Sequence, residues 1–498
     1  MHKAVLCLDS GTTRVKAAVY STAGELLGFA EAENTALVRN GSHLTQDMET
    51  TRVLNLSVVR ECIRNAGVPI SAMILSAQGD GLWALDKARN PYMDGIVWLD
   101  GRAKDVLSRL ERDGILNSIR GITLSKPTSA SQTILMRWLK ENSPVDYERL
   151  GYALRLKDWL FFALTGELMT ETSNILPIWG DPRKGLLSRK IPELLGLEKG
   201  IEVVPEVRDV RHCHAMLRRE VANSLGINYT FPVYLGPSDV QATAIGLGVG
   251  FRTGINSCSV FGTASIHVGY ASSPAFWKEI PPGCFIQPYA LLPGFVCLHP
   301  GLNGAGTFKH IDKLTNNTAT QNREIVPAES DLLVLPFFEE GGERAPFTNP
   351  NAQGAIFGLK ASSTPEQIRW AAREALAFLG RISQDMLYAE NIVAVGGGLS
   401  QDKHFMQFYA DCLGRELHCF ESANVGLYGL ALLLISVLDH EAFNTLRQKP
   451  LGSSHIYRPR YEVFGEIDRK FNFFKELATL SLKFSDAYHD EDCAPEDN

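Results

Sequence analysis

Several features of secreted and membrane proteins are missing from this chain of 498 residues. Its nine cysteines are scattered, form no C-x-x-C pair and are odd in number. This usage does not suit a disulfide framework and favours a reducing cytoplasm. No apolar run is long enough to span a bilayer, and no basic and apolar leader precedes the first strand. We therefore expect a cytoplasmic protein without a membrane partner.

The chain also lacks an excess of basic residues, because 49 lysines and arginines stand against 56 aspartates and glutamates, for a net charge of -7. Nucleic-acid binders normally carry a basic patch or stripe, so nucleic acid is not an expected partner. A zinc site is not expected either, because the densest cluster, His212-Cys213-His214, has no further ligand at a suitable spacing. The length exceeds what one core supports, which predicts at least two domains.

The first 20 residues of the chain contain two apolar strands joined by a short polar turn that begins at Asp9. Gly11 lets the backbone approach a phosphate, and successive N–H groups in such a turn form an anion-binding concavity. The hydroxyls of Thr12 and Thr13 can also donate to phosphate oxygens. Asp9 can reach Mg²⁺ through the waters of the metal. A plain hairpin with a Gly-Thr turn has the same pattern, so this segment alone leaves both interpretations open.

The second half of the chain begins with a similar pattern. Strands are predicted over 256–261 and 265–270, with Gly262 and Thr263 between them. We interpret this pattern as a diverged internal duplication of the first hairpin. Its turn could hold a phosphate from the opposite side, or it could be a simple β-turn.

Two further motifs lie between a strand and a helix. Asp239 follows the predicted strand 232–236, where it could cap the next helix or serve as the general base of a phosphoryl transfer. Gly397 and Gly398 belong to a run of three glycines after the strand 392–395. Such a run lets the backbone approach a nucleotide, although a tight strand–helix turn needs glycine as well.

Strands and helices alternate along the chain, which predicts an α/β protein. We place a domain boundary near Gly250, giving domains over 1–250 and 251–484. The last stretch, 485–498, is acidic and has no apolar periodicity, so we expect it to be disordered. Apolar spacing predicts helices over 49–66, 103–112, 131–141, 159–165, 242–249, 365–390 and 403–413.

These motifs together resemble the FGGY family of carbohydrate kinases, in the actin, Hsp70 and sugar kinase superfamily, over nearly the whole chain. The most specific segment is 335–347, which is similar to the family's Pro-aromatic…Gly-Glu-Arg-x-Pro element. The glycine run and 425–431 resemble its adenosine-side elements. The resemblance implies two RNase H-like α/β domains around a central cleft. It places the sugar and the catalytic base on 1–250 and the nucleotide on 251–484.

The resemblance also implies individual roles, with ATP and Mg²⁺ as cofactors. Asp239 matches the catalytic base, and Asp9 matches the carboxylate linked to Mg²⁺. Asp239 is also expected to face this metal. The positions that match phosphate-gripping and nucleotide-binding turns are Thr12, Thr13, Gly262, Thr263, Gly397 and Gly398. The residues expected to bind the sugar or polyol are Gln78, Gly79, Asp80, Trp98, Asp100, Arg102, Asp239 and Gln241.

Two of these assignments have a structural alternative. Asp100 and Arg102 could form an ion pair that only holds their loop. Tryptophans near the pocket segments could be core residues, and for Trp159 we prefer that interpretation.

One position departs from the family pattern, because Leu135 stands three residues before Trp138, where the family's first signature usually has lysine. The segment around it still resembles L-xylulose kinases, while 78–83 and 157–160 equally resemble erythritol kinases. The expected reaction is transfer of the γ-phosphoryl of Mg-ATP to a hydroxyl of a small sugar. The preferred candidate for this sugar is a ketopentose such as L-xylulose.

Three alternatives to this substrate and activity stay open. The first is an erythritol-type polyol kinase, and the second is another pentulose or glycerol kinase. The third is a non-catalytic sugar sensor of the same fold, although a decayed sensor would be expected to have lost Asp9 or Asp239. A homodimer is expected only because homodimers are common.

Overall fold

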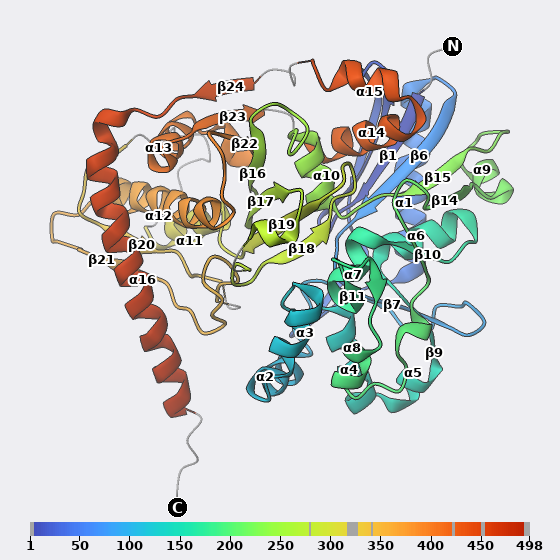
Figure 1. The fold of residues 1–498 in the computed structure, drawn as a ribbon, viewed down its shortest axis with the longest axis horizontal. Helices are drawn as coiled ribbons and strands as arrows, with labels where there is room; N and C mark the ends of the chain where they lie inside the picture. Colours follow the sequence, from blue (N-terminus) through green and yellow to red (C-terminus); the bar gives the residue numbers. More distant parts are fainter. Residues whose placement is uncertain are drawn as a thin grey trace, which may run out of the picture.

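The computed structural model describes residues 4–277, 280–315, 327–339, 342–420, 424–449 and 454–492, with 489–492 described by their backbone alone. Two large sheets lie in separate halves of the molecule, with helices packed around them (Figure 1). This is the two-domain α/β architecture that the sequence predicts. Within the described residues, no helix combines the length and the apolar character that a membrane crossing requires.

The first sheet has six strands, which in spatial order are β14 (His214–Met216), β15 (Pro232–Leu235), β6 (Ile70–Ala77), β1 (Ala4–Ser10), β2 (Arg14–Ser21) and β3 (Leu26–Glu33). β1 pairs antiparallel with β2 and parallel with β6, and β6 pairs parallel with β15. Every residue of β1 is buried except Asp9, which is half-buried. An unbroken apolar strand of this kind is typical of a sheet covered on both faces.

The second sheet has seven strands, which in spatial order are β18 (Phe285–Pro288), β19 (Phe295–Gly301), β17 (Ser265–Ala271), β16 (Ile255–Phe261), β22 (Ile392–Gly396), β23 (Glu416–Phe420) and β24 (Ser454–Tyr457). β16 pairs antiparallel with β17 and parallel with β22, and β22 pairs parallel with β23. These pairings repeat those of β1 with β2 and β6, and of β6 with β15. The internal duplication that the two Gly-Thr turns indicate is therefore confirmed by the strand topology.

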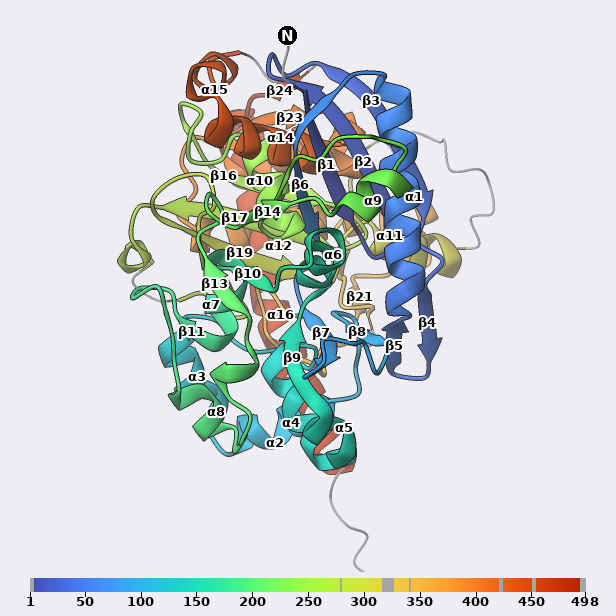
Figure 2. The ribbon, with the colours of Figure 1, turned by 90° about the vertical axis from the view of Figure 1, so that its right-hand side faces the viewer.

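The segment between β6 and β15 adds a second layer to the first half. It contributes β7 (Gly81–Asp86), β8 (Gly95–Val97) and β9 (Leu150–Leu154), which join β4 (Leu37–Asn40) and β5 (His43–Gln46) in a five-stranded sheet. Figure 2 shows most of the helices of this segment gathered below the first sheet. The helices of the whole segment are α2 (Lys104–Arg112), α3 (Ile115–Thr123), α4 (Gln132–Asn142), α5 (Pro144–Arg149), α6 (Leu156–Thr165), α7 (Thr172–Trp179), α8 (Lys190–Leu194) and α9 (Arg219–Ser224), of which α9 lies beside the first sheet.

The sheets are also flanked by helices that begin and end at recognisable caps. The carboxylate of Asp47 accepts a hydrogen bond from the amide of Thr50 at 2.6 Å and starts α1 (Met48–Ala66), and Gly67, with φ of 63°, ends it. The helices of the second half are α11 (Gly306–Leu314), α12 (Pro365–Met386), α13 (Lys403–Leu413), α15 (His440–Leu446) and α16 (Phe464–Asp492), with the two-stranded sheet of β20 (Leu333–Leu335) and β21 (Ala355–Phe357).

The two halves are joined by a close crossing of α10 (Asp239–Gly246) and α14 (Val425–Leu438), which lie between the two sheets (Figure 1). A Cβ atom on Gly429 would lie 1.8 Å from the carbonyl oxygen of Ala242, and one on Gly246 would lie 2.1 Å from that of Val425. The backbones therefore touch, which only small residues allow. This contact explains why the sequence of α10 is so rich in alanine and glycine.

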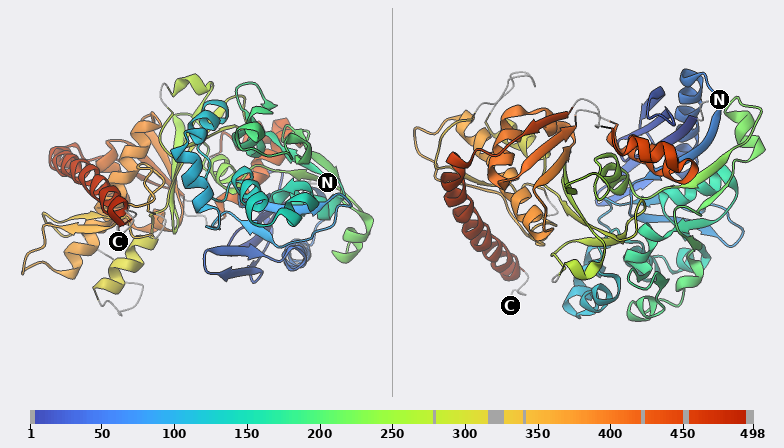
Figure 3. Two further views of the ribbon diagram at one scale, coloured as in Figure 1. Left: turned by 90° about the horizontal axis from the view of Figure 1, so that it is seen from below. Right: turned by 45° about the horizontal axis from the view of Figure 1, so that its top comes forward.

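The expectation of a disordered C-terminal tail is wrong for residues 485–492, because they continue α16; residues 493–498 lie outside the described part of the chain. Figure 3 shows α16 along the outer side of the second half. The carboxylate of Asp486 accepts a hydrogen bond from Asn349 Nδ2 at 2.9 Å, so polar contacts extend the helix beyond its apolar residues. The buried side chains of α16 recur at helical spacing: Ile467, Phe471, Phe474, Ala478 and Ser485.

Candidate functional site

The carboxylate of Asp9 lies at the end of β1, opposite Lys16 on β2. Its Oδ1 atom is buried and has no hydrogen-bond partner. Burial raises the pKa of Asp9 to about 7, and the nearby negative charge of Asp239 contributes to that rise, while Lys16 opposes it. The first turn thus presents a half-buried carboxylate whose ionised form needs a cation.

Asp239 is the first residue of α10, directly after the β15 strand and the Gly236-Pro237-Ser238 turn. The helix cap is Ser238, so the cap interpretation of Asp239 is wrong. Its Oδ1 atom accepts a hydrogen bond from the amide of Val240 at 2.8 Å. Burial raises the pKa of Asp239 to about 6, and the backbone N–H groups at the helix start oppose the rise. A carboxylate with this pKa is suited to accept a proton near neutral pH.

Asp9 ends β1 and Asp239 follows β15, the two strands on either side of β6, and the charge of Asp239 contributes to the raised pKa of Asp9. Mg²⁺ keeps several of its waters and is usually held by one or two carboxylates. The unpartnered Oδ1 of Asp9 and the repulsion between the two carboxylates both fit a divalent cation between them. Among the described residues, no group of three or more histidine, cysteine, aspartate or glutamate side chains forms a larger metal site.

Thr12 connects the first turn to the segments expected to bind the sugar. Its hydroxyl donates to Gln78 Oε1 at 3.0 Å and accepts a hydrogen bond from Trp98 Nε1 at 2.8 Å. The backbone N–H of Gln78 also donates to the backbone carbonyl of Ser10 at 3.3 Å. Gln78 Nε2 is buried without a partner, so it is a free donor next to the turn. The hydroxyl of Thr12 is therefore already bonded to the sugar side of the site, and only its backbone N–H can serve a phosphate.

Asp80 lies deeper in the same segment. Its Oδ2 atom accepts hydrogen bonds from Ser131 at 3.1 Å and Thr128 at 3.4 Å, and its Oδ1 atom is buried without a partner. Burial raises its pKa, whereas the positive charges of Arg155 and Arg344 lower it. An acceptor in this state is suited to bind a substrate hydroxyl.

Arg344 is a site residue that our sequence assignments did not name, although it is the arginine of the Gly-Glu-Arg-x-Pro element. It belongs to the second half of the chain, yet its charge acts on Asp80 and its guanidinium lies 5.9 Å from the centre of the Trp98 ring. The preceding Glu343 is buried and accepts from Asn303 Nδ2 at 2.7 Å and from the amide of Leu302 at 2.6 Å. Glu343 thus fixes the loop, and Arg344 brings a positive charge from the second half to the sugar side.

Asp100 and Arg102 form the structural ion pair that we considered as the alternative. Both carboxylate oxygens of Asp100 accept from Arg102, at 2.8 and 2.9 Å, and Oδ2 also accepts from the amide of Leu44 at 2.6 Å. The pair is almost fully buried. The carboxylate of Asp100 is therefore used within the protein, and it positions Arg102, whose guanidinium lies 5.2 Å from the centre of the Trp138 ring.

The structure contradicts the expected role of Gln241 in substrate binding. Its Nε2 atom donates to Gln287 Oε1 at 2.7 Å and to the carbonyl of Pro288 at 3.1 Å, and its Oε1 atom accepts from the amide of Ala290 at 3.1 Å. Gln241 is fully buried on α10 and joins it to β18 and the segment that follows. Two residues beyond Asp239, a helix points its side chain to a different side, which is why proximity in sequence misled the assignment.

Two other predicted residues have different outcomes. Gly79 lies beside the turn that precedes Asp239, since a Cβ there would be 3.7 Å from Ser238 Cβ. Trp159 is a core residue, as we preferred, with its Nε1 donating to the carbonyl of Met48 at 3.2 Å.

The first turn is held by Asn34, which our sequence assignments also missed. Its Nδ2 atom donates to the carbonyl of Gly11 at 3.1 Å, and its backbone amide donates to the carbonyl of Thr13 at 2.8 Å. Both carbonyls of the turn are thereby used within the protein. Asparagine after a strand carries no distinctive sequence signal, so this role could not be predicted from one chain.

In the second half, Gly262 and Thr263 lie next to the glycine run. The carbonyls of Gly262 and Thr263 accept hydrogen bonds from the amides of Ala305 and Gly306 at the start of α11, at 2.9 and 3.1 Å. Gly397 has φ of 91°, and a Cβ there would lie 2.3 Å from the carbonyl oxygen of Phe261. The structure therefore places both predicted nucleotide turns at the carboxyl ends of β16 and β22.

The duplication gives these turns a common geometry. Val260 pairs with Gly396 in the second sheet, as Ser10 pairs with Ala77 in the first. Gln78 thus follows β6 as Gly397 follows β22. The duplicated fold is the two-domain arrangement that the resemblance to the sugar kinases predicts.

Comparison with known proteins gives the same result. Residues 4–246 match the N-terminal domain of the FGGY family of carbohydrate kinases, and residues 257–436 match its C-terminal domain. The chain belongs to the FGGY family of carbohydrate kinases.

Its relatives carry several substrate names. A probable L-xylulose kinase of Pasteurella multocida is 27% identical over 95% of this chain and 98% of its own length, and an erythritol kinase of Brucella abortus is 25% identical over 86% of both chains. Among solved structures, a gluconate kinase from Lactobacillus acidophilus aligns with a TM-score of 0.86 at 18% identity, covering 98% of this chain and all of its own. A xylulose kinase from Rhodospirillum rubrum gives the same TM-score of 0.86 at 19% identity, covering 97% of this chain and 100% of its own. The structural matches confirm the fold.

Proposed function

We propose that this carbohydrate kinase transfers the γ-phosphoryl of Mg-ATP to a hydroxyl of a small sugar, with Asp239 as the base and Asp9 as the carboxylate that faces the metal. The observation that carries the proposal is the pair of neighbouring carboxylates with raised pKa values, Asp9 near the end of β1 and Asp239 at the start of α10. A phosphoryl transfer needs little covalent chemistry from the protein beyond positioning, charge stabilisation and a proton acceptor.

The residues of the chain divide this work. Asp239 accepts the proton of the substrate hydroxyl, while its α10 position keeps the carboxylate fixed. Backbone N–H groups of the turns at Thr12-Thr13 and Gly262-Thr263 bind phosphate oxygens, and the Gly397-Gly398 turn leaves room for the nucleotide. When bound, Mg-ATP supplies the transferable phosphoryl group.

The sugar side is formed by Gln78, Asp80 and Arg344, with Trp98 as the adjoining ring. Gln78 Nε2 and Asp80 Oδ1 are a buried donor and a buried acceptor without partners. Buried polar atoms without partners are costly, and substrate hydroxyls would satisfy both. Gly79 lies between Gln78 and Asp80 in the chain. Arg102 completes the proposed pocket, and Asp100 contributes only by holding the guanidinium of Arg102 in place.

For the substrate, we propose a ketopentose of the L-xylulose type, with an erythritol-type polyol as the alternative. The names of the two relatives support these two classes without choosing between them. The ratio of kcat/KM for L-xylulose to that for erythritol tests the choice: a ratio above one supports the ketopentose, and a ratio below one supports the polyol. The cytoplasmic location and the homodimer stay predictions.

The first prediction concerns pH. With Mg-ATP far below its KM, so that the free protein is titrated, kcat/KM for the sugar is expected to rise with pH between about 5 and 7. Asp239, with a pKa of about 6, must lose its own proton before it can accept the proton of the substrate hydroxyl. Asp9, with a pKa of about 7, adds to the loss at low pH, because its protonated form does not attract the metal. A profile that is flat from pH 5 to pH 8 would contradict both assignments.

The second prediction concerns Gln78→Ala. The change removes the partner of Thr12 and the free Nε2 donor, so KM for the sugar is expected to rise by about 5- to 30-fold, the loss expected for one to two hydrogen bonds. KM for ATP is expected to stay within about twofold, because Gln78 lies on the sugar side.

The matched control is Gln132→Ala in the same half of the chain. Gln132 is also buried, but its Nε2 donates to the carbonyl of Leu154 at 2.9 Å and its Oε1 accepts from Trp179 Nε1 at 2.7 Å. This control is expected to lower the melting temperature without a selective change in KM for the sugar. If Gln78→Ala changed only the melting temperature, its proposed role would be wrong.

A further inference from the structure

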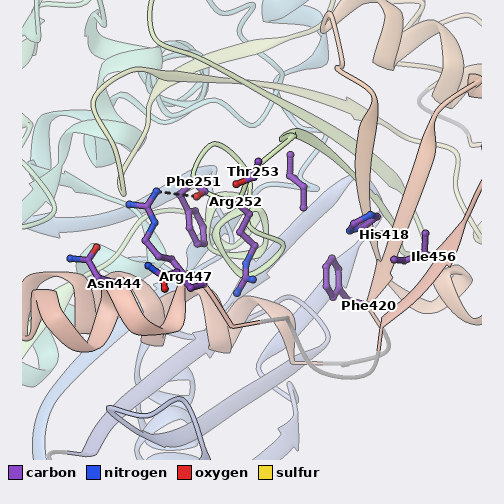
Figure 4. A pocket seen from close by; sticks show the side chains of 10 residues that line it. Phe251, Arg252, Thr253, His418, Phe420, Asn444, Arg447 and Ile456 are labelled. Carbon is purple, nitrogen blue, oxygen red and sulfur yellow. Dashed lines mark hydrogen bonds between the residues drawn. The ribbon is translucent and has the colours of Figure 1, made fainter.

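A cavity of about 680 Å³ lies beside the connection between the two halves, outside the proposed catalytic site. Its walls come from the segment after α10, from α15 and the residues that follow it, and from β23 and β24 (Figure 4). The cavity reaches Ile255 at the start of β16, whereas the Gly262-Thr263 turn follows the other end of this strand. None of the residues assigned to the proposed reaction lines it.

Two arginines are the charged residues that the cavity offers. Arg252 donates to the carbonyls of Lys449 and Leu446 at the end of α15, and Arg447 donates to the carbonyl of Phe251 at 3.2 Å (Figure 4). Arg252 Nε is buried without a partner. In the described part of the chain, neither guanidinium has a carboxylate partner. Their positive charges are therefore balanced only by backbone carbonyl dipoles.

Among the described residues that line the cavity, the remaining side chains are polar or apolar and none is acidic. Asn444 and Gln448 come from the same segment of the chain as Arg447, and Phe251 and Phe420 contribute rings. The nearby Glu416 is already paired with His418 at 2.8 Å and with Arg458 at 3.0 Å. The chain has more acidic than basic residues, 56 against 49. Two arginines that have no acidic partner among the described residues therefore give this cavity a local positive charge that the overall composition does not predict. The planar fork of arginine suits phosphate oxygens in particular.

We infer that this cavity binds the phosphate group of a small phosphorylated metabolite between Arg252 and Arg447, with the rest of the ligand against the two phenylalanine rings. Such a ligand would bridge residues 251–255, which follow α10, and the end of α15. The end of α15 itself contacts the first half, since Lys449 Nζ donates to the carbonyl of Ala23 at 3.4 Å. The ligand would thus join two segments of the second half, beside this contact with the first half. The inference does not depend on the proposed phosphoryl transfer.

The cavity also has a physical link to the predicted nucleotide turn. Ser400 Oγ lies 3.1 Å from the carbonyl oxygen of Phe420 and 2.8 Å from that of Gly397, so the two carbonyls share its single proton. A ligand that shifts Phe420 would therefore act on the turn that follows β22. The test must separate binding in the cavity from binding at the nucleotide turns.

The experiment measures binding of inorganic phosphate, a sugar monophosphate and AMP to the full chain by calorimetry, with a non-hydrolysable ATP analogue present to fill the nucleotide site. Arg447→Gln is the main variant, because Arg447 is exposed and its loss spares the core. Arg219→Gln is the matched control, since Arg219 is also exposed and also donates to one backbone carbonyl, that of Asn228.

We expect at least one of the three probes to bind, and Arg447→Gln to weaken that binding by about tenfold or more, the loss of one charge-assisted hydrogen bond. The control is expected to leave the affinity unchanged. Tighter binding of the sugar monophosphate or AMP than of phosphate would show that the rings hold the organic part. If inorganic phosphate bound as tightly as the sugar monophosphate and AMP, the two arginines would recognise the anion alone, and the proposed contact of the ligand with the rings would be wrong.

Three results would overturn the inference. One is that none of the probes binds when the nucleotide site is filled. Another is that Arg447→Gln, correctly folded by its melting curve, binds them as tightly as the unchanged chain. The third is that amide hydrogen exchange in 251–255 and 442–449 is not slowed by the bound probe, because those segments form the walls of the cavity.

Discussion

Replacing Asp239 by asparagine is expected to lower kcat by about 10²- to 10⁴-fold, the usual contribution of a positioned general base. Asparagine keeps the size of the side chain but cannot accept the proton of the substrate hydroxyl. The fold is expected to persist, because Asp239 begins α10 without serving as its cap. Asp9 keeps its carboxylate and loses a neighbouring negative charge, so Mg-nucleotide binding is expected to remain. Steady-state kinetics and nucleotide calorimetry on the same preparation measure both effects.

The matched control is Asp105→Asn. Asp105 also lies in the first turn of a helix in the first half, but it is exposed on α2. Its replacement is expected to leave kcat within about twofold, since exposed substitutions away from a site have small effects. If Asp239→Asn turned over sugar at a rate close to that of the unchanged chain, Asp239 would not be the base.

The second large effect is expected for Gly397→Ala. The backbone of Gly397 has φ of 91°, and the added Cβ would meet the carbonyl oxygen of Phe261 at 2.3 Å. Strain and overpacking together are expected to lower the free energy of unfolding by about 2–4 kcal/mol. Phe261 ends β16 immediately before Gly262, so the phosphate turn must shift with it, and nucleotide affinity is expected to fall as well. Chemical denaturation and nucleotide calorimetry measure the two losses.

Gly398→Ala controls this prediction at the adjacent position. A Cβ there meets no heavy atom within 4 Å. Its free energy of unfolding is expected to change by less than about 1 kcal/mol, the ordinary cost or gain of a glycine-to-alanine change. Equal destabilisation by both alanines would contradict the account of the glycine turn.

Much of the fold follows from local patterns. The strands of both hairpins are largely buried, and the turns between them contain glycine and threonine, so the sequence indicates their duplication. Helix α1 begins at an aspartate cap and ends at a glycine, which are strong local signals. Asp239 lies shortly after a short buried strand and at the start of a helix, a local context that favours a helix cap, so its expected role as the base came from the resemblance to the FGGY family.

The misassigned and missed residues depend on contacts between distant parts of the chain. Gln241 binds β18 and its flanking segment, about 50 residues away, and no local pattern indicates such a partner. Arg344 reaches Asp80 and Trp98 from the other half of the molecule. Helix α16 extends past residue 485 through a contact with Asn349. A single sequence shows the propensity of a segment but not the surface on which it packs.

The central claim is tested most directly by acceptor-dependent ADP formation. Purified full chain is given Mg-ATP and, one at a time, ketopentoses, polyols and ketohexoses, with Asp239→Asn run in parallel. The account predicts that at least one acceptor, L-xylulose first, strongly increases ADP release, with one sugar phosphate formed per ADP and no increase in the variant. ATP consumption that is the same with and without every acceptor would contradict the assignment of Asp239 and of the sugar pocket.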